Sequence, residues 1–281
     1  MAAAPLIPQT IYDFGANNGD DVDYYLRKAE RVVAIEANPI LASEIEARFA
    51  DEIAEKRLFV EACVVTAGPQ ASAVPFYVHR THHPMSQFPR PINIGDYEEI
   101  TLPSRPVGDI LAQHGEPHYI KIDIEHYDEA ILRAVFDAGA FPPFISAEAH
   151  SVDIFAVLLA IGGYQAFKLV DGFSVGDVYR SHEIAGRDGP EQRSFPKHSA
   201  GPFGDDIAGP WRSADHISRI LTAEEFGWKD IHASRVREPD LGAAMNLRQL
   251  GVKALRKWGR RRLGTLVPLP AGHPIKQFLD G

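Results

Sequence analysis

The sequence predicts an α/β fold built on a doubly wound, mostly parallel sheet of seven strands. Short apolar runs alternate with stretches whose apolar residues recur at helical spacing. Strand, helix and strand follow one another at distances that suit right-handed crossovers, and such crossovers make neighbouring strands parallel. A glycine-containing turn joins the first strand to the first helix, and an acidic residue ends the second strand.

The expected elements follow in order along the chain. Strands are expected at residues 10–14, 31–36, 58–65, 118–124, 144–149, 164–170 and 226–233, and helices at 20–29, from Pro39 onwards, at 127–136 and at 152–161. Proline is tolerated at a first helical position, and glycines end the helix at 152–161. Two insertions interrupt this order: a hairpin of residues 74–79 and 98–102 before the fourth strand, and a long loop, 171–217, before the last strand.

The composition is that of a globular protein, with 281 residues of which 45% are hydrophobic and 24% charged. The net charge of −9 argues against nucleic-acid binding through overall charge. One cysteine, Cys63, excludes an intrachain disulfide and favours a reducing compartment. Because no apolar run reaches membrane-spanning length and the first residues lack the regions of a signal peptide, we expect a cytoplasmic protein.

The two ends of the chain differ in character. We expect one domain over residues 1–235 and a basic C-terminal extension over 236–281. Six basic residues and no acidic residue lie between Lys253 and Arg262. Such a run is either a solvated helix face or a contact for an anionic lipid, glycan or carrier.

The turn after the first strand carries the strongest local signal, the residues DFGANNG at 13–19. Glycines let the backbone turn sharply and approach a ligand closely. Glu36 ends the second strand 21 residues after Gly15, where a carboxylate can accept both hydroxyls of a ribose. The loop lacks the central glycine that a bound pyrophosphate needs, and Asp13 would repel phosphate and attract an ammonium group. This favours S-adenosylmethionine over NAD, the alternative being a turn that merely requires glycine.

Three segments together resemble the signatures of the FkbM family of S-adenosylmethionine-dependent methyltransferases: DFGANNG at 13–19, VAIEANP at 33–39 and YIKIDIE at 119–125. The residues EAIL at 129–132 and ISAEAH at 145–150 extend the resemblance, which covers roughly residues 8–170. It implies the Rossmann-like class I methyltransferase fold and O-methylation. One departure is His126, because the family usually has glycine after the glutamate of its third motif.

The resemblance also implies the cofactor site. Gly15 and Gly19 would approach the cofactor, Glu36 would hold its ribose, and residues near Ala62 and Cys63 would wall its adenine. The full set of expected cofactor contacts is Asp13, Gly15, Ala16, Asn17, Gly19, Glu36, Ala37, Ala62, Cys63 and Asp123.

The acceptor side is expected where the next two strands end. Lys121, Asp123 and Glu125 alternate on one strand, so they should share one face. We interpret Lys121 as a structural ion-pair partner and the two acids as functional, since buried parallel strands are otherwise apolar. Glu148 and His150 repeat the pattern on the following strand. His150 is the expected general base, because a histidine pKa near ~6.5 suits that work, and Asp123 or Glu148 would orient it.

Further residues are expected around the acceptor. Glu125, His126, His82 and His83 are the expected substrate contacts, the last two from the inserted hairpin. The set Asp123, Glu125, Glu148 and His150 has donors that suit Mg or Mn, but no local spacing enforces a metal, and none is expected. Residues 195–211 combine glycine, proline and aromatic residues, which fits either a lid over a sugar or a static cap.

The leading hypothesis is an S-adenosylmethionine-dependent O-methyltransferase that acts on a hydroxyl of a sugar or small secondary metabolite. An NAD(P)-dependent oxidoreductase shares the fold and Glu36 but needs the missing glycine. A non-catalytic module that keeps the fold and recruits a partner through the basic tail is the third alternative. Such a module has no need of Asp123 and His150 on adjacent buried strands.

Overall fold

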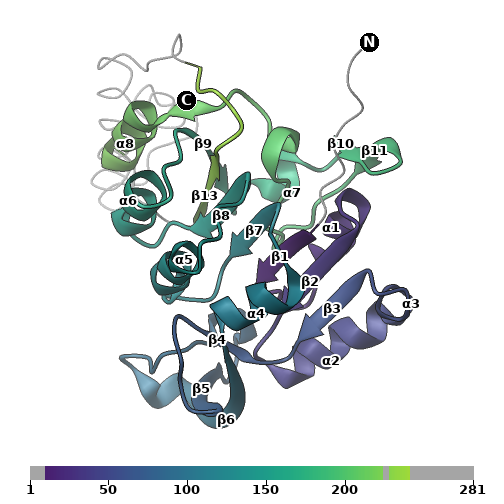
Figure 1. Ribbon diagram of the computed structural model, residues 1–281, viewed down its shortest axis with the longest axis vertical. Helices are drawn as coiled ribbons and strands as arrows, with labels where there is room; N and C mark the ends of the chain where they lie inside the picture. Colours follow the sequence, from purple (N-terminus) through teal and green to yellow (C-terminus); the bar gives the residue numbers. More distant parts are fainter. Residues whose placement is uncertain (1–9, 224–227, 241–281) are drawn as a thin grey trace, which may run out of the picture.

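The computed structural model describes residues 10–223 and 228–240, in which strands and helices alternate as the sequence predicts (Figure 1). The strands are β1 (Thr10–Phe14), β2 (Arg31–Ile35), β3 (Leu58–Glu61), β4 (Val64–Thr66), β5 (Ala73–His79), β6 (Tyr97–Pro106), β7 (Tyr119–Ile122), β8 (Phe144–Glu148), β9 (Ala166–Asp171), β10 (His182–Gly186), β11 (Gly189–Arg193), β12 (Arg212–Ser213) and β13 (Lys229–Ser234). The α-helices are α1 (Val22–Lys28), α2 (Pro39–Arg48), α3 (Ala50–Ala54), α4 (Val107–His114), α5 (Asp128–Asp137), α6 (Val152–Ala160), α7 (Val175–Val178) and α8 (Ala214–Ala223).

The main sheet is mixed and has eight strands in the order β12-β9-β13-β8-β7-β1-β2-β3. The five strands from β8 to β3 are parallel to one another, whereas β13 runs antiparallel to β8 and β9. The expected count of seven is therefore wrong by one strand, the two-residue edge strand β12. The chain order reverses between β1 and β7, and in such sheets ligands bind beyond the carboxyl ends of the strands at that point.

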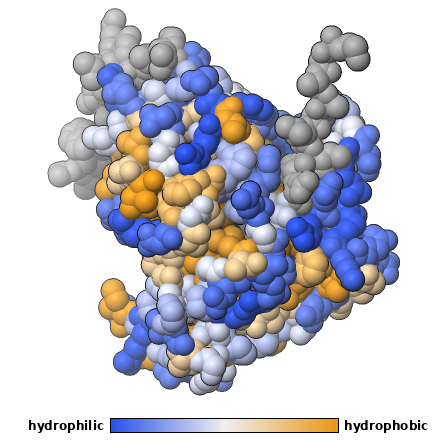
Figure 2. All heavy atoms as spheres, viewed as in Figure 1, coloured by the Kyte–Doolittle hydropathy of each residue, from blue (hydrophilic) through white to orange (hydrophobic). Residues whose placement is uncertain are grey.

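Two hydrophobic layers cover the sheet. On one face Ile120 and Ile122 of β7 pack with apolar residues of α4, α5, α6 and α8. On the other face Ile11 and Val32 pack with α1 and with residues from the segment 175–211. Because both faces are covered, β1 and β8 are buried along their whole length. Hydrophobic residues also reach the surface between hydrophilic ones in the view of Figure 2.

The hairpin expected before the fourth strand is confirmed as β5 and β6, which pair antiparallel. They form a separate sheet with β4, at the bottom of Figure 1. The expected strand 58–65 is therefore divided: β3 lies in the main sheet, and β4 pairs with β6. A tight bend, in which Cys63 N donates to the Glu61 carbonyl at 3.0 Å, separates the two.

The expected loop at 171–217 is instead mostly ordered, with α7, the hairpin β10–β11 and β12. Its aromatic residues explain this difference. The Phe203 ring stacks on Tyr119 of β7 with centroids 4.1 Å apart, and Phe195 lies edge-on to Tyr24 of α1. Asp21 accepts hydrogen bonds from the Ser199 hydroxyl and from Ala200 N. Most of residues 195–211 thus pack as a cap on one face of the sheet.

The last described residues remain attached to the body of the fold. Asp240 N donates to the Trp211 carbonyl at 2.8 Å, and Arg237 forms an ion pair with Asp205. The basic run between Lys253 and Arg262 lies outside the described residues. No helix in the described part of the chain is long and apolar enough to cross a membrane.

We predict that Phe203→Ala lowers the free energy of unfolding by about 3–5 kcal/mol, the usual cost of removing a buried aromatic ring. Phe173→Ala is the matched control, because that ring is 77% exposed, and it should cost less than about 1 kcal/mol. Urea unfolding followed by circular dichroism measures both values. Equal losses of unfolding free energy in the two variants would contradict the packing of Phe203 against the sheet.

Candidate active site

A cavity of about 480 Å³ opens at the carboxyl ends of β1, β2, β7 and β8. Its walls also include the loop after β5 and aromatic residues near β9 and β13. Many of the residues expected from the sequence line it, namely Gly15, Asn17, Glu36, Ala37, Cys63, His82, His83, Asp123, Glu125 and Glu148. Six expected contacts do not line it, namely Asp13, Ala16, Gly19, Ala62, His126 and His150.

The glycines of the first turn allow neighbouring parts of the protein to pack closely against it. Gly15 has φ +86°, and a Cβ there would lie 1.8 Å from the carbonyl oxygen of Asp123. Gly19 has φ +74°, and its Cβ would meet Ile45 of α2 at 2.9 Å. Gly15 therefore seats the turn against the end of β7, whereas Gly19 lets α2 pack and does not contact the cavity. Ala16 is buried and donates its N–H to the Ile35 carbonyl.

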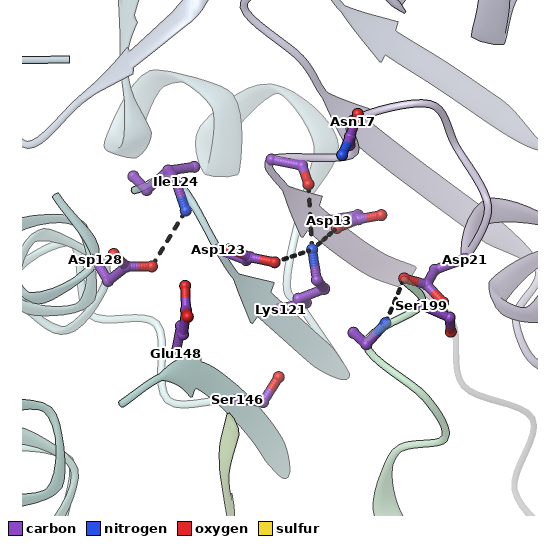
Figure 3. Close-up of polar contacts among 12 residues, drawn as sticks. Asp13, Asn17, Asp21, Lys121, Asp123, Ile124, Asp128, Ser146, Glu148 and Ser199 are labelled. Carbon is purple, nitrogen blue, oxygen red and sulfur yellow. Dashed lines mark hydrogen bonds and ion pairs between the residues drawn. The ribbon is translucent and has the colours of Figure 1, made fainter. Parts of the chain in front are cut away.

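Lys121 lies beneath this turn, as Figure 3 shows. Its Nζ is 3.2 Å from an Asp13 oxygen, 3.4 Å from an Asp123 oxygen and 3.1 Å from the Gly15 carbonyl oxygen. The interpretation of Lys121 as a structural ion-pair partner is confirmed. Burial, opposed by Lys121, raises the pKa of Asp13 to about 6. Asp13 supports the turn from below, which corrects the expectation that it meets the ligand.

Glu36 is held with both carboxylate oxygens in place. Oε2 accepts from Asn17 N at 2.8 Å and Oε1 from Asn38 N at 2.7 Å. Burial raises the pKa of Glu36 to about 7, although these two hydrogen bonds favour the charged form. Each oxygen keeps a second lone pair for a donor in the cavity. Beside it Cys63, with Val64 and Val65, forms an apolar wall, whereas Ala62 is exposed and lies outside the cavity.

The residues after β7 depart from the expected alternation. The strand ends at Ile122, so Glu125 does not share a strand face with Lys121. Glu125 and His126 have φ of +51° and +66°, the left-handed region that favours glycine. The family's usual glycine at the position of His126 suits that geometry. Glu125 reaches the cavity through this turn, and His126 instead places its ring 4.7 Å from the ring of His150.

His150 pairs with Glu148 and not with Asp123. Its Nε2 is 2.9 Å from a Glu148 oxygen and 3.7 Å from an oxygen of buried Asp128. Burial alone would lower the pKa of His150, but Glu148, Asp128 and Glu125 raise it to about 9. With this pKa the imidazole favours its protonated form at neutral pH, which argues against the expected role of His150 as the general base. Glu148 is the member of the pair that lines the cavity.

Sequence reasoning missed the aromatic part of the site. Phe88 and Tyr127 line the cavity with their rings edge to face, 5.2 Å between centroids. Phe173, His198 and Trp228 also line the cavity. Single aromatic residues in loops carry no spacing signal, and the sequence had suggested this region only through the hairpin histidines and the possible lid at 195–211. No group of three or more metal-ligating side chains occurs among residues 10–223 and 228–240.

We predict that Gly15→Ala lowers the free energy of unfolding by at least about 2 kcal/mol more than Gly139→Ala does. Both glycines have positive φ, but no atom lies within 4 Å of a Cβ at Gly139. The control variant therefore measures the backbone strain alone, about 1 kcal/mol. Chemical denaturation gives both values. Equal losses of unfolding free energy would show that Gly15 does not pack closely against Asp123.

One family of known proteins matches more than half of this chain. The family model described as the methyltransferase FkbM domain matches residues 13–160. No curated protein matches the sequence. Among solved structures, the FkbM methyltransferase from Methylobacillus flagellatus is 21% identical over 58% of this chain and 40% of its own, with a TM-score of 0.41.

Two further structures are less similar in sequence. A Podospora anserina methyltransferase bound to SAH (S-adenosylhomocysteine) is 13% identical over 50% of this chain and 46% of its own, with a TM-score of 0.31. An SAH complex of a Bacillus cereus O-methyltransferase is 9% identical over 81% and 74%, with a TM-score of 0.35. The chain thus spans less than half the length of the first two structures. Since the family model covers more than half of it, this chain belongs to the FkbM methyltransferase family.

Proposed function

We propose that this protein is an S-adenosylmethionine-dependent O-methyltransferase that acts on a hydroxyl of a sugar or small metabolite. The observation that carries the proposal is Glu36, whose two oxygens are fixed by backbone N–H groups at the edge of the cavity. Two fixed acceptor oxygens suit the paired hydroxyls of a ribose. Membership of a methyltransferase family supports a sulfonium nucleoside over a nicotinamide cofactor.

The residues of the cavity fit such a cofactor along its length. Glu36 would hold the ribose, and the apolar wall that includes Cys63 would contact the adenine. The turn around Gly15 and the carboxylate of Asp123 would hold the amino-acid end. When bound, S-adenosylmethionine supplies a methyl group whose bond to sulfur breaks as the acceptor oxygen attacks.

We assign the proton of the acceptor hydroxyl to Glu148. This carboxylate lines the cavity on β8, two strands from β1, so it lies on the side away from Glu36. His150 contacts it at 2.9 Å and, as an imidazolium, orients it and compensates its burial. His150 is thus a positioning residue and Glu148 the general base. General bases of this kind contribute about 10²–10⁴-fold to the rate.

We predict that Glu36→Gln weakens SAH binding about 10- to 100-fold at pH 8, because a neutral amide replaces a charged acceptor. Wild-type affinity should fall as the pH decreases through about 7, where Glu36 takes up a proton. The variant should lack this pH dependence. Titration calorimetry from pH 5.5 to 8.5 measures both effects, with Glu44→Gln on the exposed side of α2 as the control. Binding of NAD in place of SAH would overturn the proposed function.

We predict that Glu148→Gln and His150→Ala each lower kcat by about 10²-fold or more and leave SAH affinity within about twofold. Wild-type turnover should decline above about pH 9, where His150 loses its proton, and the His150 variant should lack this decline. Methyl transfer from labelled S-adenosylmethionine over a pH series provides both readouts. An unchanged rate in Glu148→Gln would remove that carboxylate from the reaction.

A further inference from the structure

The cavity is lined by more acidic than basic side chains. Four carboxylates line it, namely Glu36, Asp123, Glu125 and Glu148, and no lysine or arginine does so among the residues that the structure describes. An acceptor that carries phosphate or carboxylate would therefore meet like charge and no compensating cation. The proposed cofactor would contact Glu36 and Asp123, so it does not explain why Glu125 and Glu148 also line the cavity.

Three of the four carboxylates have partners in the protein. Asp123 is 3.4 Å from Lys121, and Glu148 is 2.9 Å from His150. Glu36 accepts two backbone hydrogen bonds and, in the proposed function, the ribose hydroxyls. Glu125 forms neither an ion pair nor a hydrogen bond with any residue in the described ranges 10–223 and 228–240. One carboxyl group that lines the cavity, that of Glu125, therefore has no hydrogen-bond or ion-pair partner among the described residues.

The backbone holds Glu125 in this position at a cost. Two consecutive non-glycine residues, Glu125 and His126, adopt positive φ. Strain of this kind persists where the surrounding structure enforces it, and it gathers at ligand sites. Burial and the charges of Asp123 and Glu148 raise the pKa of Glu125 to about 8, although the charge of His150 lowers it. The Glu125 carboxyl therefore favours its neutral form at neutral pH, and a bound ammonium group would favour its charged form instead.

Aromatic side chains line the same cavity as Glu125. Phe173 is 77% exposed and lies edge-on to Trp228, with ring centroids 5.4 Å apart. The ring of His198 stacks over Trp228 at 6.3 Å with an interplanar angle of 19°. All three line the cavity. Exposed aromatic faces attract both the apolar face of a sugar ring and a nearby cation.

We propose that the acceptor is an amino sugar, whose ammonium group pairs with Glu125, whose ring packs on Trp228 and Phe173, and whose hydroxyl is presented to Glu148. This rests on the proposed function and names its substrate class. The pairing also explains transfer to oxygen: an ammonium group has no free electron pair, so the amine held by Glu125 is not methylated. The hydroxyl oxygen forms the new bond to carbon, and its proton passes to Glu148.

Binding to the SAH-loaded full-length protein tests this without turnover. The probes are matched methyl glycopyranosides that differ at one position, with a 2-, 3- or 6-amino group, the parent hydroxyl, or a 6-carboxylate. We expect the best amine to bind at least about 10-fold tighter than its hydroxyl parent and the carboxylate to bind most weakly. The advantage of the amine should shrink as ionic strength rises, because the ion pair is screened.

Glu125→Gln should reduce the affinity for the amine to that of the parent sugar, with the parent sugar and SAH affected less than about twofold. Glu129→Gln is the matched control, since that carboxylate is exposed and pairs with Arg133 on α5. Equal affinities for amine and parent, no binding of any amine, or an amine preference that survives Glu125→Gln would overturn the amino-sugar assignment while SAH still binds. Failure of SAH itself to bind would instead overturn the proposed function.

Discussion

A single buried ammonium group holds the two turns of the site together. Lys121 and Asp13 are 5% and 1% exposed, and neither charge would be tolerated there without the other. Because the same Nζ also contacts the Gly15 carbonyl and Asp123, the turn after β1 and the end of β7 are fixed relative to each other. The backbone of Gly15 also packs directly against the Asp123 carbonyl, so main-chain contact holds the same two turns together. The cavity opens directly above this junction.

Most of the main sheet could be predicted because its strands and helices differ in the period of their apolar residues. The hairpin β5–β6 follows from the same pattern. The division of residues 58–65 into β3 and β4 could not be predicted, since its apolar run is continuous and only pairing partners separate the two. The cap could not be predicted because its aromatic residues follow no regular spacing. They pack against α1 and β7, and the sequence does not display such contacts.

The candidate site was predictable to the extent that strand ends determine it. Glu36, Asp123 and Glu148 line the cavity because each stands at or beside the end of a parallel strand. Spacing could not show that β7 stops before Glu125 or that His150 turns away to pair with Glu148. Spacing also could not distinguish a glycine that lets a ligand approach closely from one that lets a helix pack closely. Gly19 is of the second kind, because its Cβ would meet Ile45 of α2. These distinctions depend on tertiary contacts, which one sequence does not display.

The family match ends at residue 160, yet the aromatic end of the cavity comes from Phe173, His198 and Trp228. The part of the chain that the family model matches therefore supplies Glu36, Lys121 and Glu148, and a segment beyond it supplies these aromatic residues of the cavity. Asp21 fastens that segment to the first helix through Ser199 and Ala200. The cavity thus joins a part that the family model describes to a part beyond its match, and the two are encoded in separable stretches of the chain.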